Sequence, residues 1–466
     1  MQALLDVLLD IFRQPAVIVA LISLIGLTVQ RKSFSDVLKG TVRTLVGFLV
    51  LAAGAGVVVA SLDPFGQMFQ HAFNVQGVVP NNEAIVGQVL LNYGSAAALI
   101  FFFGMIVNIV LAATSRFKYI YLSGHVAFYM AAMIAVILGV AGFDTWAVVL
   151  WGSLAQGLVM TLSPALVQPF MRRVTGNDNV ALGHTGGAGI ALSGLVALLT
   201  RGKGTSKSTE DLTIPKGLGF LRDTTVIVAL SMGIIYLIVT VFAGPTYVET
   251  ELSDGQNYIV YALLQAATFS AGVFVILAGV RVVLAEIVPA FKGISERLVK
   301  NAKPALDVPI VFTFAPNAVL IGFISSFVGG ILGMLVMVAA GTAIIVPGVV
   351  AHFMTGAAAG VIGNATGGRR GAVLGAFSNG VAITFLPLML LPVLGEIGFA
   401  NSTFSDADYG IVGLYLGGLS VGGGQVAVIG GIVVALLGVY IGSAWLRSRE
   451  QRAQKNQVPA TVTTTN

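Results

Sequence analysis

Long apolar segments recur along almost the whole chain, and their length restricts the fold more than any other feature. A helix needs about 20 mostly apolar residues to cross the hydrocarbon core of a bilayer, and about eleven segments meet or approach this length. The sequence therefore predicts an all-α polytopic membrane protein. We expect spanning helices at residues 16–29, 45–62, 95–114, 126–141, 145–162, 225–242, 258–280, 318–339, 349–365, 371–394 and 426–445.

Charge is scarce and unevenly placed. Only 10% of the 466 residues are charged, whereas 56% are hydrophobic; soluble domains average about 25% charged residues. Basic residues gather in loops such as 31–39, 201–216 and 281–303, and acidic loops at 249–254 and 396–408 alternate with them. The positive-inside rule places the basic loops in the cytoplasm, the N-terminus outside and the C-terminus inside. This placement explains the net charge of +5 without a nucleic-acid partner.

Several functional classes lack their sequence signals. The chain has no cysteine and four well-separated histidines, so we expect neither a disulfide nor a metal site. It has no Walker A motif and no nucleophile with an adjacent base, so we expect no catalytic residue and no cofactor. The membrane domain is predicted to cover residues 1–446. The polar residues 447–466 are predicted to form a disordered cytoplasmic tail.

Three apolar segments do not fit simple membrane crossings. Residues 84–94 precede a span without a charged break between them. Residues 183–200 lie between two basic loops, so they must enter and leave the membrane on the same side. Residues 304–318 follow a basic stretch directly and contain Asp307 and Asn317 among three prolines. A charge at membrane depth is costly, and proline prevents a continuous helix. Such a segment persists only where protein or a water-filled cavity shields it. We therefore predict re-entrant or broken segments, which is how transporters build solute sites.

A few polar side chains in apolar surroundings are candidates for binding a solute. Asp307 could accept hydrogen bonds from solute hydroxyl groups, or be a structural carboxylate paired with Lys303. His125 and Tyr129 share one helix face and offer both donors and acceptors; the alternative is an interfacial histidine beside an aromatic belt. His184 lies between glycines, which allow a ligand to approach the backbone closely.

A second set of candidates precedes the segment at residues 84–94. Asn81, Asn82 and Glu83 lead directly into it. They could cap the N-terminus of a short helix, because its free N–H groups need acceptors. The same open N–H groups could instead hold a solute anion or hydroxyl.

A weak echo links the two halves of the chain. Residues 39–46 and residues 292–299 both contain a Lys-Gly pair followed, after four residues, by Leu-Val. A distant internal duplication and chance are both compatible with this pattern.

Short motifs in a fixed order cover most of the chain. The most specific are Gly-Ile-Ser-x-Arg-Leu at residues 293–298 and Phe-Ala-Pro-Asn-Ala-Val at residues 314–319. Through these motifs the chain resembles the membrane component, enzyme IIC, of the ascorbate-specific phosphotransferase system. The remaining motifs that carry the resemblance are residues 31–33, 39–41, 122–125, 183–184, 279–281, 285–286 and 291–292.

The resemblance implies an architecture and a set of partners. It implies eleven spans with two re-entrant hairpins, a mobile core domain that carries the substrate, and a V-shaped domain that forms a homodimer. Transport would be elevator-like, across the cytoplasmic (inner) membrane of a bacterium. A separate cytoplasmic IIB protein would phosphorylate the sugar acid, with phosphate relayed from phosphoenolpyruvate through a IIA protein.

The resemblance also implies a substrate site for L-ascorbate or a similar sugar acid. Well-known members of the family carry glutamine where Tyr129 and Thr185 stand, which leaves the identity of the sugar acid open. The residues that match the family's binding positions are Asn82, Glu83, His125, Tyr129, His184, Thr185 and Asp307.

Two other classes of protein fit the residues less well. An ion-coupled secondary transporter of a small organic anion would use Asp307 or Glu286 as its coupling group. A membrane scaffold without transport activity would have no use for the broken polar segments.

Overall fold

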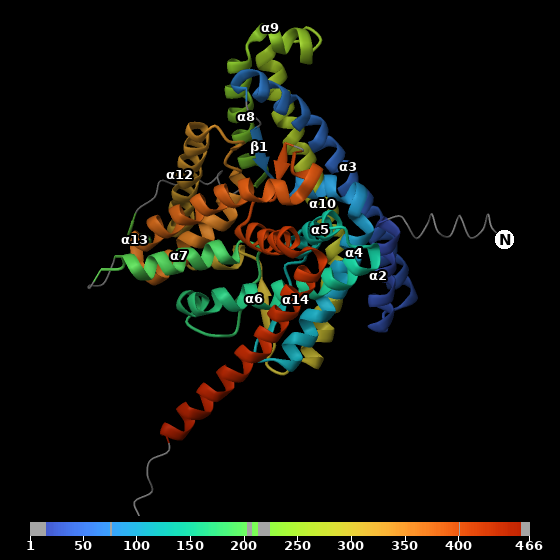
Figure 1. Ribbon diagram of the computed structural model, residues 1–466, viewed down its shortest axis with the longest axis vertical. Helices are drawn as coiled ribbons and strands as arrows, with labels where there is room; N and C mark the ends of the chain where they lie inside the picture. Colours follow the sequence, from blue (N-terminus) through green and yellow to red (C-terminus); the bar gives the residue numbers. More distant parts are fainter. Residues whose placement is uncertain (1–14, 75–76, 203–206, 213–223, 400, 458–466) are drawn as a thin grey trace, which may run out of the picture.

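The computed structural model describes residues 15–74, 77–202, 207–212, 224–399 and 401–457, and is mostly helical (Figure 1). The first helices are α2 (Pro15–Val29), α3 (Phe34–Phe73), α4 (Asn82–Thr114), α5 (Gly124–Val140), α6 (Thr145–Thr175), α7 (Gly187–Thr200) and η1 (Thr209–Asp211). The later helices are α8 (Thr224–Ala243), α9 (Pro245–Tyr247), η3 (Val248–Leu252), α10 (Tyr258–Leu298), α11 (Pro309–Phe312), α12 (Pro316–Ala340), α13 (Val349–Leu390), η4 (Leu391–Phe399) and α14 (Ala407–Gln457).

Many of these helices can span a bilayer. Among the described residues, seven helices are long and apolar enough to cross a membrane. A pair bent by 101°, Val228–Ala243 with Pro245–Leu252, would make an eighth if it is one span. The prediction of a helical polytopic membrane protein is confirmed, whereas the number eleven stays a prediction. Two of the predicted spans, residues 349–365 and 371–394, fall largely within α13, on either side of a bend at Gly368, where φ is 63°.

The three irregular apolar segments behave differently from one another. Residues 84–94 run without interruption into α4, so the prediction of a break there is wrong; no proline follows to end the helix. Residues 183–200 begin as a non-helical turn before α7. Residues 304–318 break as predicted, into a strand, the single turn of α11 and the start of α12. Pro309 and Pro316 open these two helices, where a missing N–H costs nothing.

Six short strands pair where the helices are interrupted. They are β1 (Gly77–Pro80), β2 (Tyr119–Tyr121), β3 (Ala181–Leu182), β4 (Lys303–Leu306), β5 (Ile344–Ile345) and β6 (Ser402–Thr403). They form two parallel three-stranded sheets, in the orders β5-β1-β6 and β2-β4-β3. Backbone bonds continue beyond the strands: Leu122 N donates to Ala305 O at 2.9 Å, and Gly183 N donates to Leu306 O at 2.8 Å.

The strand order reveals an internal repeat. β1, the first strand of the first half, lies between the last two strands of the second half, and β4 lies between the last two strands of the first half. Long helices precede both central strands, α3 before β1 and α10 before β4. The echo between residues 39–46 and 292–299 follows a different register, because the first falls at the start of α3 and the second at the end of α10.

The helices pack in two groups. One group contains α2, α3, α8 and α10, and the other contains α4–α7 and α11–α14. Figure 1 shows α7, α12 and α13 on the side of the molecule opposite α2 and α3. Within the first group, α3 and α10 touch through glycines: a Cβ on Gly54 would lie 2.9 Å from Gly272 O, and one on Gly279 would lie 2.6 Å from Gly47 O. Small residues allow such close backbone contact in membranes.

The C-terminal helix extends beyond the expected end of the membrane domain. Residues 447–457, which the sequence assigns to a disordered tail, continue α14 to Gln457. Residues 458–466 lie outside the described residues. α14 bends at Gly423 and Gly424, and its second half projects away from the rest of the molecule (Figure 1).

We predict opposite effects for two Gly→Ala substitutions on α3. In Gly54→Ala the new Cβ would lie 2.7 Å from Ile276 N, and overpacking of this kind costs about 1–3 kcal/mol. In Gly56→Ala the new Cβ meets nothing within 4 Å, and replacing glycine inside a helix stabilises it by about 0.5–1 kcal/mol. Thermal unfolding in detergent should give a lower Tm for Gly54→Ala and an unchanged or higher Tm for Gly56→Ala. Equal Tm values would contradict the glycine contact.

Candidate functional site

A cavity of about 670 Å³ lies where the six strand-to-helix turns meet. Five of the turns contribute at least one residue to its wall, the first turns of α13 contribute Val350, Ala351 and Met354, and α10 closes the remaining side. Because each strand leads into a helix, the turns bring helix N-termini, with their free N–H groups, towards one place. The polar residues that line the cavity from the turns and from the helix starts that follow them are Asn81, Asn82, Glu83, Ser123, His125, His184, Asp307, Ser405 and Asp406.

Asp307 lies between two histidines in this cavity. One carboxylate oxygen is 3.6 Å from His125 Nε2, and the other is 3.8 Å from His184 Nε2. The Asp307 side chain is 34% exposed, and that of His125 is 31% exposed, so both can reach a solute. Asp307 follows β4 directly, whereas the histidines follow β2 and β3. The sheet β2-β4-β3 therefore sets the spacing of these three groups.

Lys303 pairs with another carboxylate. Its Nζ lies 2.5 Å from Asp178, which also accepts hydrogen bonds from Arg172 at 2.9 and 3.1 Å. Partial burial would raise the pKa of Asp178, but the hydrogen bonds from Arg172, Lys303 and Gln168 hold that pKa well below its usual range. The alternative in which Lys303 neutralises Asp307 is therefore wrong, and the ion-pair partners of Asp307 among the described residues are the two histidines.

The backbone fixes the proton of His184. Its Nδ1 accepts a hydrogen bond from Gly186 N at 2.9 Å. A neutral imidazole that accepts at Nδ1 carries its proton on Nε2, the atom that faces Asp307. Its ring is almost completely buried, at 6% side-chain exposure. His184 is thus held as a hydrogen-bond donor towards Asp307 and the cavity.

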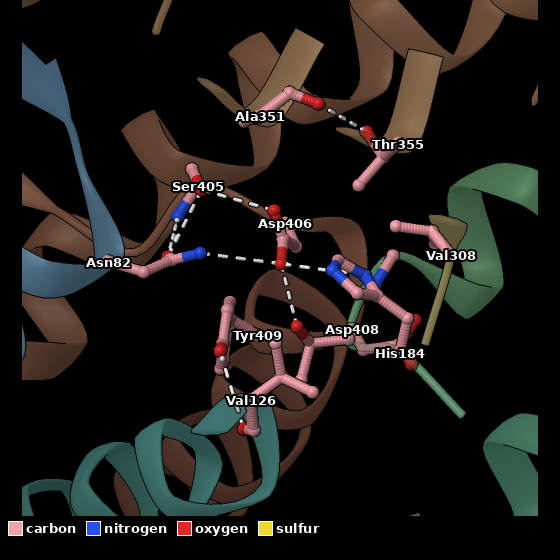
Figure 2. Close-up of polar contacts among 12 residues, drawn as sticks. Asn82, Val126, His184, Val308, Ala351, Thr355, Ser405, Asp406, Asp408 and Tyr409 are labelled. Atoms are coloured by element: carbon pink, nitrogen blue, oxygen red, sulfur yellow. Dashed lines mark hydrogen bonds and ion pairs between the residues drawn. The ribbon is translucent and has the colours of Figure 1, made fainter. Parts of the chain in front are cut away.

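A further carboxylate, the buried Asp406, lies beside His184 (Figure 2). It is 2% exposed and accepts hydrogen bonds from Thr185 Oγ1 at 2.6 Å and Asn82 Nδ2 at 3.3 Å. Its other oxygen accepts from Ser405 Oγ at 3.1 Å, and His184 Nδ1 lies 3.9 Å away. Asp406 therefore joins three turns, those after β1, β3 and β6.

The neighbouring Asp408 bonds the same turns to the helices around them. It accepts from Ser163 Oγ and from Ala188 N, both at 2.6 Å, and is 5% exposed. It thereby ties α14 to α6 and to the first turn of α7. From sequence, both carboxylates belong to an acidic outer loop at residues 396–408. Their only local signal is the pattern Ser-Asp-Ala-Asp at the start of an apolar segment, which is also typical of a solvated helix cap.

The structure brings together six of the seven residues singled out from sequence. Asn82, Glu83, His125, Tyr129, His184 and Asp307 all line the cavity. Thr185 does not line it: the residue is 1% exposed, and its hydroxyl group is used in the bond to Asp406. Asn81 caps α4, since its side chain accepts from Ala84 N at 2.8 Å.

Two polar atoms on the cavity wall are buried without a partner. Tyr129 Oη and Ser123 Oγ have no hydrogen-bond partner among the described residues, although both residues line the cavity. A buried polar group without a partner costs free energy. A bound solute with hydroxyl groups could satisfy both atoms. Within the described ranges, no cluster of three or more His, Asp or Glu residues is suited to a metal ion.

A bundle of membrane helices with a polar, partly enclosed cavity at helix breaks defines a solute permease. Residues 10–408 match the family of sugar-specific permease components of the phosphotransferase system, EIIC-GAT. The chain belongs to this family and is a multi-pass protein of the cytoplasmic membrane. A relative named "Ascorbate-specific PTS system EIIC component", from Mycoplasma pneumoniae, is 26% identical over a 460-residue alignment that covers 86% of this chain and 67% of the relative.

Substitution of Thr185 tests the role of its hydroxyl group. Thr185→Val keeps the shape but removes the donor to Asp406, and a buried acceptor that loses its partner costs about 1–3 kcal/mol. Thr185→Ser keeps the hydroxyl group and should lose less. We expect Tm values in the order wild type, Thr185→Ser, Thr185→Val. A valine variant as stable as the serine variant would show that the bond to Asp406 does not stabilise the fold.

Proposed function

We propose that this chain is the IIC permease that binds L-ascorbate or a related sugar acid and moves it across the membrane. The observation that carries the proposal is the cavity in which Asp307 lies between His125 and His184. The name of the Mycoplasma pneumoniae relative supports the same substrate class.

The chemistry of the cavity suits a small anion with several hydroxyl groups. Helix N-termini carry partial positive charge and favour an anion. His184 donates from Nε2, and His125 can donate or accept. Asp307 can only accept while ionised, so it is suited to hydroxyl groups rather than to the acidic group of the substrate. Tyr129 and Asn82 add further hydrogen-bonding groups to the wall.

The proposal includes the architecture that the sequence resemblance implies. It has eleven spans with two re-entrant hairpins, a core domain that moves, and a V-shaped domain that forms the homodimer. The two packing groups of helices support a division of this kind, because the polar turns belong to one group and α10 to the other. In an elevator-like movement the group with the polar turns would slide along the group that contains α10 and carry the solute.

The proposed reaction partners are separate proteins. Membership of the phosphotransferase family implies cytoplasmic IIA and IIB proteins that carry phosphate. The IIB protein would phosphorylate the sugar acid as it leaves the cavity. The permease itself would supply binding and translocation, with no catalytic residue of its own.

An ion-coupled transporter remains the competing function, and its two candidate coupling groups differ. Glu286 lies 3.6 Å from Arg43 and does not line the cavity, whereas Asp307 does. Accumulation of labelled ascorbate in vesicles separates the two functions. We expect accumulation that requires phosphoenolpyruvate, the IIA protein and the IIB protein. Accumulation driven by a proton gradient alone would contradict the proposal.

Asp307→Asn should impair uptake more than membrane insertion. The change removes a charged acceptor, and such hydrogen bonds contribute about 1.5–3 kcal/mol, which is about ten- to a hundredfold in affinity. Labelled ascorbate uptake should fall accordingly at unchanged protein abundance in the membrane. Asp254→Asn, in an exposed loop, is the matched control and should transport normally. Normal uptake by Asp307→Asn would contradict the proposed role.

Tyr129→Phe should weaken binding without lowering stability. The hydroxyl group has no partner among the described residues, so its removal costs the unliganded protein nothing. A bound solute would lose one hydrogen bond, which corresponds to roughly two- to tenfold in Kd. Tyr236→Phe is the opposite control. Tyr236 Oη donates to Ser61 O over 2.5 Å, and neither residue lines the cavity. Tyr236→Phe should lower the Tm and leave the Kd of the solute unchanged. The same change in Tm and Kd in both variants would contradict the role of Tyr129 in binding the solute.

A further inference from the structure

The charges around the cavity pose a problem for an acidic substrate. The carboxylates among the described lining residues are Glu83, Asp307 and Asp406, and the permanent cation among them is Arg281. Carboxylates repel an anion, and the repulsion is strong where water is excluded. Helix N-termini offset part of it, since their partial charges act over about one turn. A sugar acid therefore needs a positive side chain in this cavity more than a neutral sugar does.

Arg281 occupies the wall opposite the polar turns. It lies on α10 with Leu277, Val280 and Ala285, so it is the charged member of an otherwise apolar surface. Arg281 is exposed to solvent in the structure. None of the cavity carboxylates pairs with it among the described ion pairs. Its guanidinium donors are thus open to a ligand from the cavity.

Arg281 could instead be a positive-inside residue at the membrane surface. Two observations favour the cavity. Arg281 lines the cavity itself, and the carboxylate five residues further along α10, Glu286, pairs with Arg43 of α3 at 3.6 Å. Glu286, the carboxylate near Arg281 on α10, is therefore paired with Arg43 rather than with Arg281.

We propose that Arg281 binds the acidic group of the substrate and makes the permease selective for anionic sugar acids over neutral sugars and neutral lactones. The proposal rests on the proposed function, because it assumes that a sugar acid occupies this cavity. The planar guanidinium group can donate two parallel hydrogen bonds to neighbouring oxygens of an enolate or a carboxylate. Asp307 and His184 then bind the hydroxyl end of the same molecule.

The position of Arg281 has a further consequence for the transport cycle. The groups that bind hydroxyls lie on the turns of one helix group, and Arg281 lies on α10 of the other. A bound acid would therefore connect the two groups in the arrangement described here. If the groups slide past each other, the contact with Arg281 is lost, and the acid is held more weakly in the second arrangement.

The test compares two ligands of similar size on the purified full-length protein in nanodiscs. L-Ascorbate is an anion at neutral pH, and L-gulono-1,4-lactone is a neutral relative with the same carbon skeleton. Titration calorimetry gives the Kd of each ligand for the wild type and for Arg281→Gln, Arg281→Lys and Arg43→Gln. Removal of one partner of a charged hydrogen-bonded pair should raise the ascorbate Kd at least about tenfold.

We expect Arg281→Gln to weaken ascorbate binding and to leave the Kd of the lactone within about twofold of the wild-type value. Arg281→Lys should lie between wild type and Arg281→Gln, and Arg43→Gln should bind both ligands normally. Equal weakening of both ligands would show a structural role, and unchanged ascorbate binding would show no role; either result overturns the inference alone. A wild type that binds no ascorbate would overturn the proposed function, and the inference with it.

The wild type also provides a test that needs no variant, should Arg281→Gln not fold. Salt screens charge–charge attraction more than neutral hydrogen bonding. Raising the salt concentration should increase the ascorbate Kd and leave the lactone Kd nearly constant. Identical salt dependence for the two ligands would contradict a cationic contact to the acid.

Discussion

The structure depends on how the chain bonds its backbone where the membrane helices are interrupted. In a bilayer an unbonded N–H or C=O group is too costly to leave exposed. Six of the interruptions in the described residues contain a short strand, and the strands meet in two parallel sheets, so these breaks bond one another. β1 joins β5 and β6, and β4 joins β2 and β3. In each sheet the central strand comes from one half of the chain and the two outer strands from the other half. Neither half alone can therefore pair the backbone groups of its strands.

The same pairing builds the cavity. Parallel strands end at the same edge, so the turns that follow them gather, and each turn begins a helix. The result is a set of helix N-termini around buried carboxylates and histidines. Asp406 and Asp408 are tolerated in this place because Thr185 donates to Asp406, and Ser163 and the backbone N–H of Ala188 donate to Asp408. Asp307, by contrast, keeps open acceptor capacity in the cavity and faces two histidines.

Because the helices divide into two groups, the cavity has one polar wall and one mostly apolar wall. The polar wall is a product of the strand-to-helix turns. The opposite wall is α10, which packs on α3 through backbone contacts at glycines. That contact fixes where α10 lies, and with it the one guanidinium group among the described cavity residues. A solute with an acidic end and a hydroxyl end would touch both walls at once.

The sequence by itself determined the membrane class, the break near Asp307 and most of the polar residues of the cavity. These follow from local properties: apolar length, proline positions and polar residues in apolar surroundings. Only the tertiary structure decided that residues 84–94 are part of an unbroken helix, that Thr185 serves Asp406, and that Asp406 belongs to the site at all. The physical reason is that strands of two to four residues have no readable periodicity, and their partners lie as far apart as β1 and β6. Whether a polar side chain meets solute, water or another side chain depends on that distant pairing.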